Sequence, residues 1–166
     1  MPELKPITRE GIASALEKAV RYRLLNEPHA AESICLDILA VDPENADAHA
    51  TLVLAITDQF DLAHGELLPN ARDAVAHLTD PYSQAYYNGI ICERWAKAVL
   101  RRGVPGSSEL AYEWIEKAMD WYARAESIRP AGDDDPLLRW NSCVRLLAAN
   151  PRLKPRESEE YEPSFE

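Results

Sequence analysis

The clearest helical signature in the chain lies at residues 108–130, which read SELAYEWIEKAMDWYARAESIRP. Ala118 and Ala125 flank the aromatic Tyr122, and Pro130 follows where the periodic pattern ends. Spacings of three and four residues place these side chains on one face of an α-helix, and a proline just past the pattern cannot continue it. Small residues let two helix axes approach closely, and an aromatic ring fills the space beside them. The stretch therefore predicts a long helix, closely packed on a neighbour.

Helical periodicity continues through most of the chain, whereas alternation of apolar and polar residues hardly appears. Asp80-Pro81 and Asp135-Pro136 are expected helix starts, because the carboxylate accepts backbone N–H groups and proline suits the first helical position. These signals predict an all-α domain over 1–150, with short turns between antiparallel neighbours, and an acidic, flexible tail over 151–166. About seven helices are expected, at 8–25, 28–41, 46–60, 65–79, 81–102, 108–128 and 136–149.

A recurring order of residue types groups the helices into pairs. The first pair carries Ala19 and Tyr22, then Ala31, Cys35, Ile38 and Pro43, and the third pair carries Gly89, then Ala118, Tyr122, Ala125 and Pro130. This order resembles that of tetratricopeptide (TPR) repeats, in which the glycine allows close helix packing. The middle pair departs from it around Leu67 to Leu78, and the insert at 102–108 breaks the strict period. The resemblance implies a short right-handed TPR-like solenoid of three irregular repeats, with 136–149 as a capping helix.

Composition and charge limit the classes of function. The formal net charge of -10 opposes binding to nucleic-acid phosphates and to acidic lipid headgroups. The start of the chain has no signal-peptide pattern and no later window is apolar over about 18 residues, so we expect a cytoplasmic protein with no membrane partner. The three cysteines, Cys35, Cys92 and Cys143, lie in apolar helical patterns and are interpreted as core residues.

No motif in the sequence indicates catalysis. The four histidines, His29, His49, His64 and His77, are dispersed and lack the spacing of metal ligands. The glycine-containing stretch 103–108 lacks the lysine of a phosphate-binding loop. We therefore predict that the protein is not an enzyme and has no metal site and no cofactor.

In TPR proteins the first helices of successive repeats line a concave groove. The resemblance assigns that role to Leu16, Val20, Ala50, Leu54, Tyr86, Ile90, Glu93, Arg94, Asn141 and Arg145. Leu, Val and Ala replace most of the Lys, Asn and Arg residues that form the family's carboxylate clamp. The expected function is a protein–protein interaction scaffold whose groove binds an amphipathic helix or an extended hydrophobic segment of another protein.

The sequence leaves two other functions open. An apolar groove or the terminal helix would also suit a symmetric homodimer, and the tail over 151–166 would also serve to cover the groove. The second open function, after the homodimer, is a small-ligand or enzymatic pocket built from Tyr86, Glu93, Arg94 and Arg145.

Overall fold

The fold is all-helical in a computed structural model that describes residues 1–62 and 66–156. No strand occurs within these ranges, which confirms that the fold is all-α as predicted. A short 3₁₀ turn at Arg9–Gly11 precedes seven α-helices. These are α1 (Ile12–Leu24), α2 (Pro28–Val41), α3 (Ala46–Thr57), α4 (Leu67–Ala76), α5 (Pro81–Arg102), α6 (Ser107–Ile128) and α7 (Asp135–Ala149).

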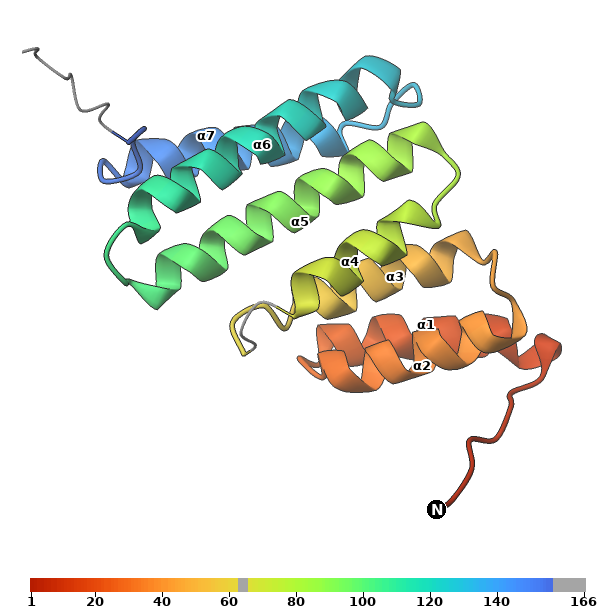
Figure 1. The fold of residues 1–166 in the computed structure, drawn as a ribbon. Coiled ribbons are helices and arrows are strands. Elements are labelled where there is room, and N and C mark those ends of the chain that lie inside the picture. The colour runs from red at the N-terminus through yellow and green to blue at the C-terminus, as the bar shows by residue number, and fades with distance from the viewer. Residues whose placement is uncertain (63–65, 157–166) are drawn as a thin grey trace, which may run out of the picture.

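Each helix packs against the next one along the chain, and α1 also contacts α3 while α3 contacts α5. Figure 1 shows α1 and α2 at one end, α3 and α4 in the middle, and α5, α6 and α7 at the other end. The long helices α5 and α6 form the most extensive contact of the fold. The helices α1, α3 and α5 therefore contact one another in that order, in addition to their neighbours along the chain.

Side chains cap the starts of two of the α-helices, α3 and α5. Asn45 Oδ1 accepts a hydrogen bond from the Ala48 amide at 2.9 Å, and Asp80 Oδ2 accepts one from the Ser83 amide at 3.0 Å. The expected capping role of Asp135 is wrong, because this residue is already helical. Asp133 Oδ1 accepts the Asp135 N–H at 3.0 Å instead, after a turn that Gly132 makes with a φ of 82°.

Three helices are shorter than the sequence pattern predicts, and the first of them covers Ile12–Leu24 rather than 8–25. The third helix of the chain ends at Thr57 rather than at 60, and the fourth covers Leu67–Ala76 rather than 65–79. After Thr57 the chain turns, which places the Phe60 ring edge-on to Trp95 of α5, with ring centroids 5.2 Å apart. Phe60 is only 1% exposed. The helix α3 thus ends before residue 60, and the Phe60 ring is buried against α5.

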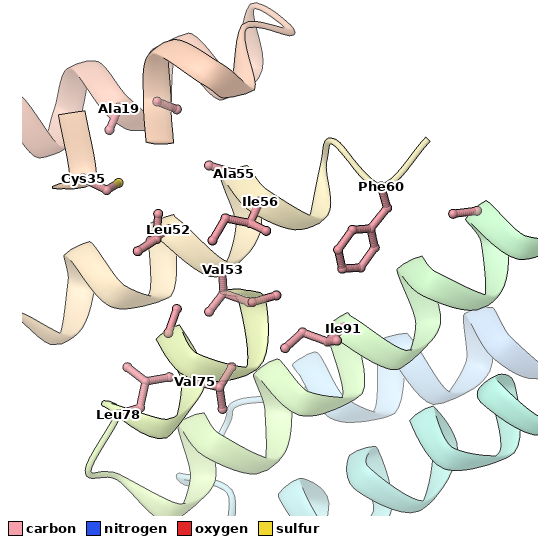
Figure 2. Close-up of a cluster of buried hydrophobic side chains, with 14 residues drawn as sticks. Ala19, Cys35, Leu52, Val53, Ala55, Ile56, Phe60, Val75, Leu78 and Ile91 are labelled. Atoms are coloured by element: carbon pink, nitrogen blue, oxygen red, sulfur yellow. The ribbon is translucent and has the colours of Figure 1, made fainter. Parts of the chain in front are cut away.

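The core consists of two clusters that meet at α5. One lies among α1 to α5, where Figure 2 shows Leu52, Val53 and Ile56 of α3 near Val75 and Leu78. The other lies among α5, α6 and α7 and includes Ile90, Ala111, Ile115, Tyr122 and Cys143. Ile91 belongs to the first cluster and Ile90 to the second, because adjacent residues on a helix project about 100° apart. The helix α5 thus joins the two halves.

The helices α5 and α6 pack closely at Gly89. A Cβ atom added at Gly89 would lie 2.4 Å from Cε1 of the Tyr122 ring. Real Cβ atoms do not approach other atoms so closely. The predicted role of Gly89 in close helix packing is therefore confirmed.

The ordered chain continues past the end of α7. Leu153 is 6% exposed, packs into the second core cluster, and donates its amide to the Asn150 carbonyl oxygen at 2.9 Å. The packed domain thus extends beyond 150, the boundary that the sequence predicts. The rest of the predicted tail, residues 157–166, and His64 lie outside the described residues.

Candidate interaction surface

Charged side chains connect three of the odd-numbered helices. Asp58, just after α3, pairs with Arg23 of α1 through Nε at 2.8 Å and with Arg94 of α5 through Nη1 at 2.6 Å. Arg23 lies three residues from Val20, and Asp58 lies four residues from Leu54, so each shares a helix side with a predicted groove residue. One surface therefore runs across α1, α3 and α5, and we call it the odd-helix face. Its members are Leu16, Val20, Arg23, Ala50, Leu54, Asp58, Tyr86 and Arg94.

Arg94 anchors α5 to the end of α3. Besides Asp58, its Nη1 donates to the Thr57 hydroxyl at 2.7 Å and to the Leu54 carbonyl oxygen at 3.1 Å. The Leu54 carbonyl oxygen also accepts the Asp58 amide at 2.9 Å, and a cation near the last turn of a helix is favourable. Burial lowers the pKa of the Arg94 guanidinium, and the charge of Asp58 opposes that shift. The arrangement is a fixed junction between two helices.

The predicted groove residues differ widely in exposure. Val20 is 41% exposed, and Asn141 and Arg145 are exposed on α7. The partly exposed members are Leu16, Ala50, Leu54, Tyr86 and Arg94. The structure brings Leu54 and Arg94 together through the hydrogen bond described above. It places Asn141 and Arg145 on α7, apart from the ion-paired junction of α1, α3 and α5.

Two of the predicted groove residues are in the core instead. Ile90 and Glu93 are each 1% exposed, so neither offers a surface to a partner in this structure. The reason is the position of α6 and α7: Ile90 packs in the cluster that contains Ile115 and Cys143. Helical periodicity places both residues on the predicted side of α5, but the following helices of the same chain cover that side.

Glu93 carries a buried charge with three partners. Its Oε2 accepts a hydrogen bond from the Tyr122 hydroxyl at 2.6 Å, and its Oε1 accepts one from Lys97 Nζ at 2.5 Å. Arg139 of α7 lies 3.8 Å from the same Oε1. Burial, followed by the Glu93 charge, raises the pKa of the Tyr122 phenol far above its ordinary value. The pairs connect α5, α6 and α7, which makes this a structural network.

The residues of the suggested enzymatic pocket do not share a described cavity. Four cavities lined by described residues have volumes of about 310 to 780 Å³, and none of these four includes Tyr86, Glu93, Arg94 or Arg145. Glu93 and Arg94 are engaged in separate networks, toward α6 and toward α3. Across the described ranges, no three His, Cys, Asp or Glu side chains are grouped so that they would hold a metal ion.

The three cysteines are buried and unpaired, as the sequence predicts for core residues. Burial raises the pKa of each thiol, to about 12 for Cys35, about 11 for Cys92 and about 12 for Cys143. The thiolate is the reactive form, so these groups are poor nucleophiles at neutral pH.

We therefore expect the native protein at pH 7.5 to react with a thiol-specific disulfide reagent at least about 100-fold more slowly than the protein unfolded in urea. All three thiols should react rapidly after unfolding. The absorbance of the released reagent anion, followed over time, measures both rates. A native thiol that reacts as fast as the unfolded ones would contradict the burial of that cysteine.

Arg23 and Asp58 are members of the odd-helix face that sequence reasoning missed. Their helical spacing from Val20 and Leu54 was the available signal, but their pairing spans 35 residues of sequence. Position on a helix indicates which side a charge occupies, and only the tertiary fold indicates its partner.

Two further findings bear on what kind of protein this is. No helix of the described residues is long and apolar enough to cross a lipid bilayer. In comparisons with known proteins, no protein-family model, curated protein or solved structure matches the chain.

Proposed function

We propose that this protein is a non-catalytic interaction scaffold whose odd-helix face binds a helix or extended segment of another protein. The observation that carries the proposal is the Arg23, Asp58 and Arg94 junction, which holds α1, α3 and α5 side by side. A surface held in one geometry before binding loses less conformational entropy when a partner docks. The proposed location is the cytoplasm, where unpaired thiols stay reduced.

The proposed arrangement is that of a TPR-like solenoid. Contacts of α1 with α3 and of α3 with α5 support it, because stacked helix pairs bring equivalent helices together. The close contact of Gly89 with Tyr122 supports the same packing for the third pair. In this arrangement α6 and α7 close the far end of the face, since they cover Ile90 and Glu93.

The accessible part of the face combines apolar and cationic groups. Val20, Leu16 and Ala50 supply apolar surface that is at least partly exposed, and Arg23 and Arg94 lie beside them with 17% and 21% of their side chains exposed. Such a surface suits an amphipathic segment that buries its apolar side against α1 and α3. Because Ile90 is buried, we expect the partner to contact α1 and α3 rather than the middle of α5.

A charge placed on the face tests the proposal. The combined substitution Val20→Glu and Ala50→Glu should leave the fold intact, because neither side chain is buried. It should weaken binding of partners recovered with the wild-type protein by about tenfold or more, because the carboxylates would be desolvated in the complex. Quantitative affinity purification with mass spectrometry, followed by titration calorimetry on the purified partner, measures the loss.

Leu110→Glu on α6 is a matched control, since Leu110 is 42% exposed and Val20 is 41% exposed. The control should keep every partner. If the substituted face retains all partners while circular dichroism shows an unchanged fold, the odd-helix face is not the binding surface.

Self-association through the terminal helix is the second candidate. Leu138 and Val144 of α7 are 63% and 43% exposed, which gives this helix an apolar outer surface. These two side chains on both copies, together with the exposed Asn141 and Arg145 that lie between them around the helix, would form a two-fold interface. Light scattering on the wild-type protein distinguishes homodimerisation from binding of another protein. A stable monomer across micromolar concentrations excludes the dimer.

A further inference from the structure

A second candidate site lies on the other side of α3 from the odd-helix face. A cavity of about 320 Å³ opens between α2 and α4, and α3 forms its floor. Its floor residues follow one another at helical spacing, and at about 100° per residue they lie nearly opposite Ala50 and Leu54. The residues that define the cavity are His49, Leu52 and Ile56 on the floor and Glu32, Asp73 and His77 on the walls.

His49 has a polar atom that no protein group satisfies. The residue is 6% exposed, and its Nε2 lies 2.8 Å from the Pro43 carbonyl oxygen. A carbonyl oxygen only accepts hydrogen bonds, so Nε2 carries the proton and Nδ1 of the neutral ring holds a lone pair. That Nδ1 is buried and has no hydrogen-bond partner. Buried polar atoms usually have a hydrogen-bond partner, so this unsatisfied acceptor calls for an explanation.

His77, on a wall of the cavity, has the same arrangement of one bonded and one free ring nitrogen. Its Nδ1 lies 2.8 Å from the Asp73 carbonyl oxygen and donates to it, which leaves Nε2 as an acceptor. The two imidazole rings are stacked, with centroids 4.9 Å apart and an angle of 7° between their planes. Both histidines therefore use one nitrogen to bind the backbone and keep a lone pair on the other.

The remaining polar side chains of the lining are Asn70, Glu32 and Asp73, and the two carboxylates add acceptors and negative charge. Glu32 already accepts a hydrogen bond at Oε2, from Gln59 Nε2 at 2.7 Å, and its Oε1 and the Asp73 carboxylate are not paired with a cation of the described chain. No lysine or arginine lines the cavity. Apolar contact comes from Leu52 and Ile56. The cavity thus joins an apolar floor to an acceptor-rich, anionic rim.

We propose that this cavity binds a small organic ammonium ion with an apolar body. The carboxylates of Glu32 and Asp73 attract the ammonium charge, and an ammonium N–H donates to one of the histidine lone pairs, while the apolar body covers Leu52 and Ile56. The volume is at the lower end of ligand pockets, so the ligand is of fragment size. The proposal does not depend on the odd-helix face, which lies elsewhere on α3.

The geometry favours an organic cation over a metal ion. Metal ligands point their lone pairs at a common centre, whereas nearly parallel stacked rings direct theirs along separate planes. The four candidate ligands of the cavity do not converge, and no such group of three exists in the described ranges.

Benzylammonium and benzyl alcohol provide a matched pair of probes, since they share a ring and differ in charge. Each is titrated into the full-length ¹⁵N-labelled protein at pH 7.5, and the imidazole ¹⁵N signals of His49 and His77 are followed by NMR. Benzylammonium should give saturable shifts at the ring nitrogens, and benzyl alcohol should bind about tenfold more weakly. A further titration uses Nα-acetyl-lysine amide, whose side chain carries a free ammonium group. If it binds more tightly than benzylammonium, a lysine side chain of another protein is the better match for the cavity.

Asp73→Asn should weaken benzylammonium binding about fivefold and leave benzyl alcohol unaffected. Asp37→Asn is the control, because Asp37 lies on α2 but lines a different cavity, and it should change neither affinity. Equal affinity for the two probes, unchanged binding by the Asp73 variant, or no saturable shift at either histidine would each overturn the proposal.

Discussion

Gly89→Ala is expected to lower the free energy of unfolding by about 2–4 kcal/mol. The new methyl group would lie 2.4 Å from the Tyr122 ring, which is itself 1% exposed and packed in the core. Alanine favours a helix over glycine by about 1 kcal/mol, so the steric cost must exceed that gain. Displacing the ring also lengthens the 2.6 Å hydrogen bond from the Tyr122 hydroxyl to Glu93. Urea denaturation followed by circular dichroism measures the loss.

A second background shows whether the ring is the cause. In a Tyr122→Leu protein the space beside Gly89 is larger, so adding Gly89→Ala should cost less than about 1 kcal/mol there. A cost of similar size in both backgrounds would mean that the Tyr122 ring does not limit the packing of α5 on α6.

Features set by local spacing were predictable from the sequence. The residues Ala118, Tyr122 and Ala125 repeat at helical intervals, and they identify the face of α6 that packs closely on a neighbour. The cap at Asp80 depends only on groups within four residues. Helix number and the all-α class depend on such short-range patterns, so the sequence was sufficient for them. The close packing of Gly89 was expected from the resemblance to TPR repeats, because its neighbour Tyr122 lies on another helix.

Features set by contacts between distant helices were not predictable. Periodicity places Ile90 and Glu93 on the groove side of α5, but it does not reveal that Tyr122 and Arg139 approach from α6 and α7. The candidate site near His49 has the same origin, because His77 stacks on it from α4, 28 residues later. A single sequence gives the face of each helix and not the helix that will cover it.

The buried charge of Glu93 leads to the other large expected effect. Glu93→Ala should lower the free energy of unfolding by about 3–5 kcal/mol, because it leaves the buried Tyr122 hydroxyl without an acceptor and Lys97 and Arg139 without their shared anion. Equilibrium urea denaturation measures the change. Glu116→Ala is the matched control, since Glu116 also accepts a tyrosine hydroxyl, from Tyr112 at 2.8 Å, but on an exposed surface. The control should cost less than about 1 kcal/mol.

Removing both partners of the buried bond separates its energy from the cost of leaving one partner alone. In a protein with Glu93→Met and Tyr122→Phe, no buried donor or acceptor of the pair remains unsatisfied, and Lys97 and Arg139 are exposed enough to turn toward water. This double variant should therefore be more stable than Glu93→Ala by about 1–3 kcal/mol. If Glu93→Ala costs no more than Glu116→Ala, the Glu93 carboxylate is not the buried acceptor that joins α5 to α6 and α7.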